Sequence, residues 1–64
     1  MIEVGQLRRW TCAGRESGML FLVLEHSPFP LTGVGMDDGW TIMESGGEPF
    51  WEETEHIEES SEPV

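Results

Sequence analysis

Apolar residues are concentrated in two stretches of this chain, and the first predicts a buried β-strand. Residues 19–24 form an unbroken apolar run that ends at Glu25. The run is too short for an independent helix and is typical of a central strand with both faces covered. The polar stretch before it, residues 13–18, contains two glycines and predicts a turn.

The second stretch, residues 39–57, predicts a β-hairpin. Aromatic and β-branched residues, which favour strands, lie on both sides of Gly46 and Gly47. Glycine adopts the positive φ that tight hairpin turns require. We therefore expect two short strands joined at this glycine pair.

The remaining segments are expected to complete a small all-β domain. Residues 4–11 predict a first strand, and the prolines and glycines of residues 26–38 predict a long loop. Residues 52–59 contain a single apolar residue, Ile57, so we expect a helical turn at 53–55 and then a closing strand centred on Ile57. The domain is predicted to span residues 1–59, followed by a flexible acidic tail at 60–64.

Four segments together resemble small SH3-like β-barrel proteins of bacteriophages. They are the opening VGQLRRW (4–10), the strand GMLFLVLE (18–25), the hairpin WTIMESGG (40–47) and the closing HIE (56–58). The resemblance implies a five-stranded SH3-like barrel, here with a long Pro/Gly loop. It also implies a phage-encoded protein that acts through protein contacts, as a virion component or as a host-directed accessory factor.

The charge is strongly negative and narrows the choice of partners. Thirteen acidic residues stand against three arginines, and the formal net charge is −10. Nucleic acids and anionic membranes are bound chiefly by lysine and arginine, so direct binding to either is not expected. The arginines lie in the first quarter of the chain, and we expect Arg8 or Arg9 to face acidic residues of the last strand. Those candidates are Glu55, Glu58 and Glu59.

The length bounds the fold and its setting. Sixty-four residues make one domain with a small core, so contact with a partner or with a second copy of the chain would add stability. The single Cys12 excludes an internal disulfide and is expected to be an ordinary thiol near a strand end. No apolar run is long enough for an export signal or a membrane span, which predicts a soluble intracellular or particle-bound protein. Together with the resemblance to phage proteins, this implies the virion or the host cytoplasm.

No set of residues predicts catalysis, a metal site or a cofactor. Cys12, His26 and His56 match no zinc-ligand spacing, and no local group would orient a Cys–His pair. Gly33 and Gly35 lead into acidic residues and a strand rather than into a helix, so they form no phosphate-binding loop. We expect a protein without enzymatic activity.

Aromatic residues are the strongest candidates for both the core and a partner contact. Phe21 and Trp40 are expected in the core. Phe50 and Trp51 are adjacent on a strand and point to opposite faces, so one of them should be exposed. The predicted loop adds two further apolar residues, which either contact a partner or close an end of the barrel. The candidate protein-binding set is Phe29, Leu31, Phe50 and Trp51.

Two functions follow from these observations. The first is a structural or accessory interaction module that contacts other phage proteins through the apolar set. The second is an inhibitor whose carboxylates imitate nucleic-acid phosphates and occupy a basic groove of a host protein. The acidic surface that would carry the second function consists of Glu52, Glu53, Glu55, Glu58 and Glu59.

Overall fold

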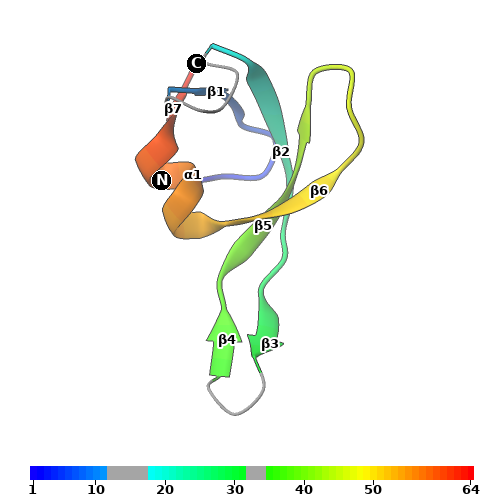
Figure 1. The fold of residues 1–64 in the computed structure, drawn as a ribbon, viewed down its shortest axis with the longest axis vertical. Coiled ribbons are helices and arrows are strands. Elements are labelled where there is room, and N and C mark those ends of the chain that lie inside the picture. Colours follow the sequence, from blue (N-terminus) through cyan, green and yellow to red (C-terminus); the bar gives the residue numbers. More distant parts are fainter. Residues whose placement is uncertain (12–17, 32–34) are drawn as a thin grey trace.

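The expectation of a mainly β fold with five antiparallel strands is confirmed (Figure 1). The computed structural model describes residues 1–11, 18–31 and 35–64. Their main sheet is open and has the strand order β6-β5-β2-β1-β7. Its strands are β1 (Leu7–Trp10), β2 (Leu20–His26), β5 (Gly39–Glu44), β6 (Phe50–Glu53) and β7 (Ser61–Pro63). The other elements are β3 (Phe29–Leu31), β4 (Gly35–Asp37) and the helix α1 (Thr54–Ser60).

The apolar run forms the central strand, as predicted. β2 lies between β1 and β5, and it pairs with both in an antiparallel manner. Phe21 and Val23 are buried on one face, whereas Leu20 and Leu22 are only half-buried on the other. The expectation that both faces are covered is therefore not met by the described part of the chain.

The glycine hairpin is also confirmed. β5 and β6 pair with Ile42 opposite Phe50 and Thr41 opposite Trp51. Gly46 has a φ of 77°, and the amide of Gly47 donates a hydrogen bond to the carbonyl of Glu44 at 2.9 Å. The turn therefore uses the positive φ that the sequence predicts.

The predicted long loop is instead largely a second hairpin. β3 and β4 pair with Phe29 opposite Asp37, and they project beyond the main sheet as an arm (Figure 1). The molecule is accordingly elongated, with extents of 36 × 22 × 21 Å. β2 and β5 are antiparallel, so the two ends of the segment between them lie side by side. Strand pairing therefore continues into that segment. Pro30 lacks a backbone N–H. A two-stranded hairpin accommodates proline at positions where the backbone N–H would point away from the partner strand.

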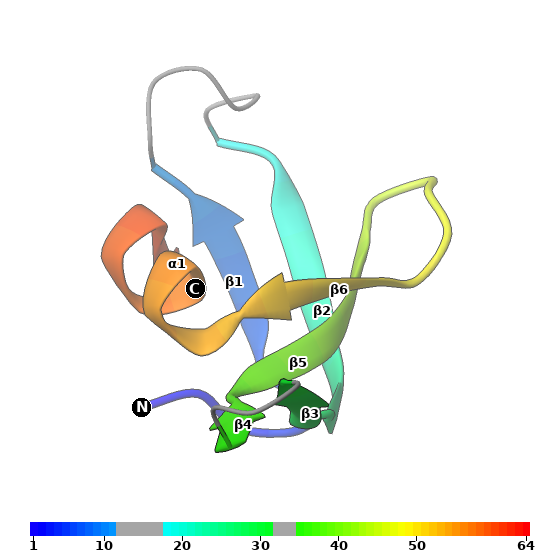
Figure 2. The ribbon, with the colours of Figure 1, turned by 60° about the horizontal axis from the view of Figure 1, so that its bottom comes forward.

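The C-terminal segment differs most from the sequence-based expectation. Ile57 lies in α1 rather than in a closing strand, and α1 follows directly on β6 over one face of the sheet (Figure 2). Ile57 is fully buried there, because a helix of two turns needs only one inward-facing apolar residue. The closing strand is β7, which pairs with β1 where a flexible tail at 60–64 was expected.

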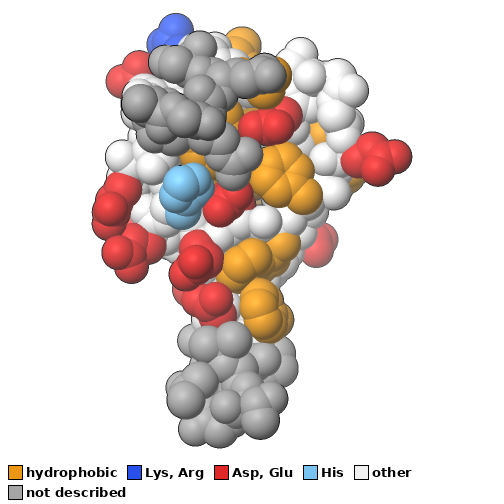
Figure 3. Space-filling model, in the orientation of Figure 1, with side chains coloured by type: hydrophobic (Ala, Val, Ile, Leu, Met, Phe, Trp, Pro, Cys, Tyr) orange, Lys and Arg blue, Asp and Glu red, His pale blue; other side chains and the backbone are white. Residues whose placement is uncertain are grey.

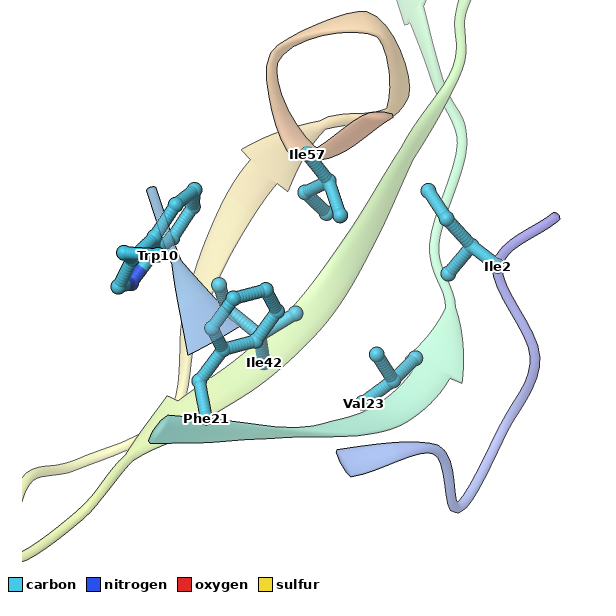
Figure 4. Close-up of a cluster of buried hydrophobic side chains, with 6 residues drawn as sticks. All are labelled: Ile2, Trp10, Phe21, Val23, Ile42 and Ile57. Atoms are coloured by element: carbon cyan, nitrogen blue, oxygen red, sulfur yellow. The ribbon is translucent and has the colours of Figure 1, made fainter. Parts of the chain in front are cut away.

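The core lies between α1 and the sheet (Figure 4). Trp10 stacks on Phe21 with ring centroids 4.4 Å apart, and both are almost completely buried. Trp40, expected in the core, is half-buried and packs at its margin, so Trp10 takes the central position instead. The buried apolar residues are Ile2, Trp10, Phe21, Val23, Ile42 and Ile57.

A buried arginine links the two ends of the chain. The exposed fraction of Arg8 is 3%. Its Nε donates to Oγ of Ser61 at 2.8 Å, its Nη2 donates to the Ser61 carbonyl at 3.1 Å, and its Nη1 donates to Oε1 of Gln6 at 2.9 Å. Burial lowers the pKa of the Arg8 guanidinium, and the carboxylate of Glu58 acts in the opposite direction. The exposed neighbour, Arg9, has its Nε 3.5 Å from a carboxylate oxygen of Glu62 rather than of a residue in 55–59.

Shortening Ile57 should destabilise the fold, because its side chain is fully buried against the sheet. We expect Ile57→Val to lower the free energy of unfolding by about 0.5–1.5 kcal/mol and Ile57→Ala to lower it by about 2–5 kcal/mol. Urea denaturation followed by tryptophan fluorescence measures both values. Val4→Ala, at a position whose side chain is 63% exposed, is the control and should change little. Equal stability of Ile57→Ala and wild type would show that α1 does not pack on the core.

Removing the Ser61 hydroxyl should also be costly. Ser61→Ala leaves Arg8 Nε without its acceptor and removes the 2.5 Å hydrogen bond from Ser61 Oγ to the Ile57 carbonyl. We expect a loss of about 1–3 kcal/mol, as for other buried polar groups left unsatisfied. Ser45→Ala, at an exposed position of the β5–β6 turn, serves as the matched control in the same urea experiment. An equally small loss in both variants would contradict a stabilising role for the Arg8–Ser61 contact.

Candidate protein-binding surfaces

The structure brings two of the four candidate apolar residues together. Phe29 of the arm contacts Trp51 of β6 edge-to-face, with ring centroids 4.7 Å apart. Phe29 remains 41% exposed. We call these two residues the aromatic pair. An aromatic contact of this kind presents a large apolar surface next to solvent.

Three features hold Trp51 in place. Its Nε1 donates a hydrogen bond to the carbonyl of Ser27 at 2.7 Å. The indole lies against Gly39, where a Cβ atom would overlap the ring. Thr41, opposite Trp51 on β5, shares a 2.7 Å hydrogen bond with the Ser27 hydroxyl. The orientation of the indole is therefore fixed by its surroundings before any partner binds.

The other two candidate residues lie elsewhere. Phe50 faces the opposite side of β6 from Trp51 and packs against the core, where it is half-buried. Leu31 belongs to β3, but its side chain lies outside the described part of the structure. Cys12 likewise falls outside the described residues.

Acidic side chains gather around α1 and reach the base of the arm, on the face shown in Figure 3. They surround a depression of about 380 Å³. Glu52 lies apart from this depression, with its half-buried carboxylate 4.0 Å from Nε2 of His56. Asp37 and Asp38 join the cluster because the arm returns the chain to the start of α1, a proximity that the sequence pattern did not reveal. The residues of this acidic depression are Asp37, Asp38, Glu53, Thr54, Glu55, Glu58 and Glu59.

Asp38 fixes the base of the arm to the start of α1. Its Oδ2 accepts a hydrogen bond from Oγ1 of Thr54, and its Oδ1 contacts Nε2 of His26, both at 2.5 Å. Oγ1 of Thr54 in turn accepts a hydrogen bond from Nε1 of Trp40 at 2.9 Å. The Thr54 hydrogen bond is the main cause that lowers the pKa of the Asp38 carboxyl, followed by the hydrogen bond to His26.

This network does not have the geometry of a catalytic triad. The carboxylate of Asp38 lies between His26 and Thr54, whereas a triad places the histidine between the acid and the nucleophile. The described residues also contain no group of three His, Cys, Asp or Glu side chains placed to hold a metal ion. Within the same ranges, no helix is long and apolar enough to cross a membrane.

A second apolar surface, which the sequence-based analysis did not propose, lies on the face of the sheet opposite the core. Leu7, Leu22 and Met43 are neighbours across β1, β2 and β5, and Leu20 follows on β2. We call these four residues the outer apolar patch. They line a shallow groove of about 230 Å³, and Leu7 is 41% exposed. The sequence predicted that Leu20 and Leu22 would be covered, and it made no such prediction for Leu7 or Met43.

Comparison of the chain with protein-family models, curated proteins and solved structures found no match.

The pKa of Asp38 should depend on the Thr54 hydroxyl. In Thr54→Val the carboxyl loses its main hydrogen-bond donor, so its pKa should rise towards the ordinary aspartate value of about 3.9. Thr54→Ser keeps a hydroxyl and should keep the lowered pKa. NMR titration of the Asp38 side chain measures both. An unchanged pKa in Thr54→Val would contradict the assigned cause.

The same shift makes part of the stability pH-dependent. A carboxyl group whose pKa is lower in the folded than in the unfolded protein stabilises the fold at pH values above the unfolded-state pKa. This stabilisation is lost as the pH falls through the folded-state pKa. In Asp38→Asn this contribution is absent, so unfolding free energies measured from neutral pH down to acid should fall less steeply than in wild type.

Proposed function

We propose that this chain is a non-enzymatic protein-interaction module that contacts its partner mainly through the aromatic pair. The observation that carries the proposal is the edge-to-face contact between Phe29, which is 41% exposed, and Trp51, whose indole is held by its hydrogen bond to Ser27. Large aromatic side chains supply much of the binding energy at protein interfaces. A side chain that is already ordered loses little conformational entropy on binding, which favours affinity.

We further propose the setting that the sequence resemblance implies. The module would be an SH3-like barrel encoded by a phage, found in the virion or the host cytoplasm, where it contacts other phage proteins as a structural or accessory component. The return of β7 to pair with β1 directly after a short helix supports the SH3-like part of this proposal. The phage origin is supported by the strand and turn motifs of the sequence alone.

A second candidate function is inhibition of a host enzyme or defence protein by nucleic-acid mimicry. The acidic depression supports it, because six carboxylates from β4, β6, α1 and the residue before β5 meet on one concave surface. Such a surface favours a basic groove as its partner and would speed the encounter at low salt. We rank it second, because the carboxylates have no evident phosphate-like spacing and the proposed aromatic contact requires no basic partner.

The experiment that separates the two functions is a pulldown from cells that make the protein, followed by mass spectrometry and binding measurements with the purified partner. If the aromatic pair carries the contact, Phe29→Ala should weaken binding tenfold or more, about 1.4 kcal/mol, and the complex should persist at about 0.5 M salt. Val4→Ala truncates another exposed apolar residue and should bind like wild type.

If the second function holds, the opposite pattern is expected. The triple variant Glu53→Gln, Glu55→Gln, Glu58→Gln should abolish binding, and the wild-type complex should dissociate at high salt because charge attraction is screened. A partner that binds both sets of variants as well as wild type would overturn both assignments.

A further inference from the structure

We propose that the outer apolar patch joins two copies of this chain face to face. The central strand, β2, is covered by α1 on one face alone. An unbroken apolar strand is typical of burial on both faces, yet α1 covers only the face that carries Phe21 and Val23. On the other face Leu20 and Leu22 form part of an open groove.

The charge distribution favours a second copy over a basic partner at this patch. The charged residues that face outward from the strands of this face are one arginine and three glutamates in a chain of net charge −10, namely Arg9, Glu25, Glu53 and Glu62. The carboxylate of Glu44, at one end of the groove, accepts a hydrogen bond from Nε1 of Trp10 on the core face. A basic partner would instead be attracted to the acidic depression around α1.

The shape of the patch also suits a two-fold contact. Leu7, Leu22 and Met43 form one row across three adjacent strands, and a row of this kind can pack against its own copy as two sheets do in a sandwich. Six buried apolar side chains in the described part of the chain form a small core, which gains stability from additional burial. A standard interface buries about 800 Å² per partner, close to one fifth of the 4117 Å² surface of this chain. Four residues cover less than that, so we expect a weak dimer that forms at high concentration.

Salt should strengthen this association. Two chains of like charge repel each other, and added salt screens the repulsion while leaving the apolar contact in place. This dependence is opposite to that of binding to a basic partner. The proposed dimer is tested separately from the proposed function, because its four residues are distinct from the aromatic pair, which lies on the same face of the sheet beside β5.

Analytical ultracentrifugation of the full chain from micromolar to millimolar concentration tests the proposal. The average mass of wild type should rise from 7.2 kDa towards twice that value, and at lower concentrations when salt is added. Leu7→Glu and Met43→Glu should remain monomeric over the same range. Val4→Glu adds the same charge at an exposed apolar position outside the patch and should dimerise like wild type at high salt.

Two further measurements test whether the variants are folded and whether the contact between the copies lies at the outer apolar patch. Near-ultraviolet circular dichroism, which reports the packed tryptophans, should be unchanged in the variants, and Leu7→Gln should also weaken the dimer without adding charge. Amide NMR shifts on dilution of wild type should be largest at Leu7, Leu22 and Met43.

Three outcomes would overturn the proposal. They are a wild-type monomer at millimolar concentration and high salt, a dimer that survives in folded Leu7→Glu and Met43→Glu, and dilution shifts centred on Phe29 and Trp51. Failure of the partner-binding experiment with Phe29→Ala would leave this proposal intact, and failure of dimerisation would leave the proposed function intact.

Discussion

The burial of Arg8 is the constraint on which the closure of the fold depends. A guanidinium removed from water requires hydrogen-bond acceptors, and Ser61 supplies two of the three that Arg8 uses. Ser61 can do so only because α1 ends just before it, with the Ser61 hydroxyl bonded to the carbonyl of Ile57. The same helix turns Ile57 into the core. The position of α1, the pairing of β7 with β1 and the burial of Arg8 therefore depend on one another.

The elements that could be predicted from the sequence are those with a local cause. The glycine turn between β5 and β6 and the apolar run of β2 each carry their information within a few adjacent residues. The C-terminal segment does not, because one apolar residue among carboxylates is compatible with a helix or a strand. Its structure is decided by Arg8 and Trp10 of β1, whose sequence distance from Ser61 hides the contact.

The sequence predicted the candidate surfaces where their cause is local and missed them where they depend on contacts between distant residues. The opposite orientation of Phe50 and Trp51 follows from strand geometry alone. The contact of Trp51 with Phe29 does not, because it needs a glycine at position 39 to admit the indole and an arm that carries Phe29 to it. The arm also brings Asp37 and Asp38 to the acidic residues of α1. Prolines and glycines in residues 26–38 indicated a loop, whereas the pairing of β2 with β5 extends into a hairpin there.

The two faces of the sheet differ in charge, and this difference limits how the surfaces can be combined. The carboxylates of the acidic depression lie around α1, whereas the outer apolar patch lies on the face that α1 leaves open. Two chains joined through the patch would keep their acidic depressions on outward-facing sides, away from each other. That separation reduces the repulsion that a net charge of −10 on each chain would otherwise impose. It would also give the pair two equivalent acidic depressions, so that a basic partner with repeated binding surfaces would be held by both, with an avidity greater than either contact alone provides.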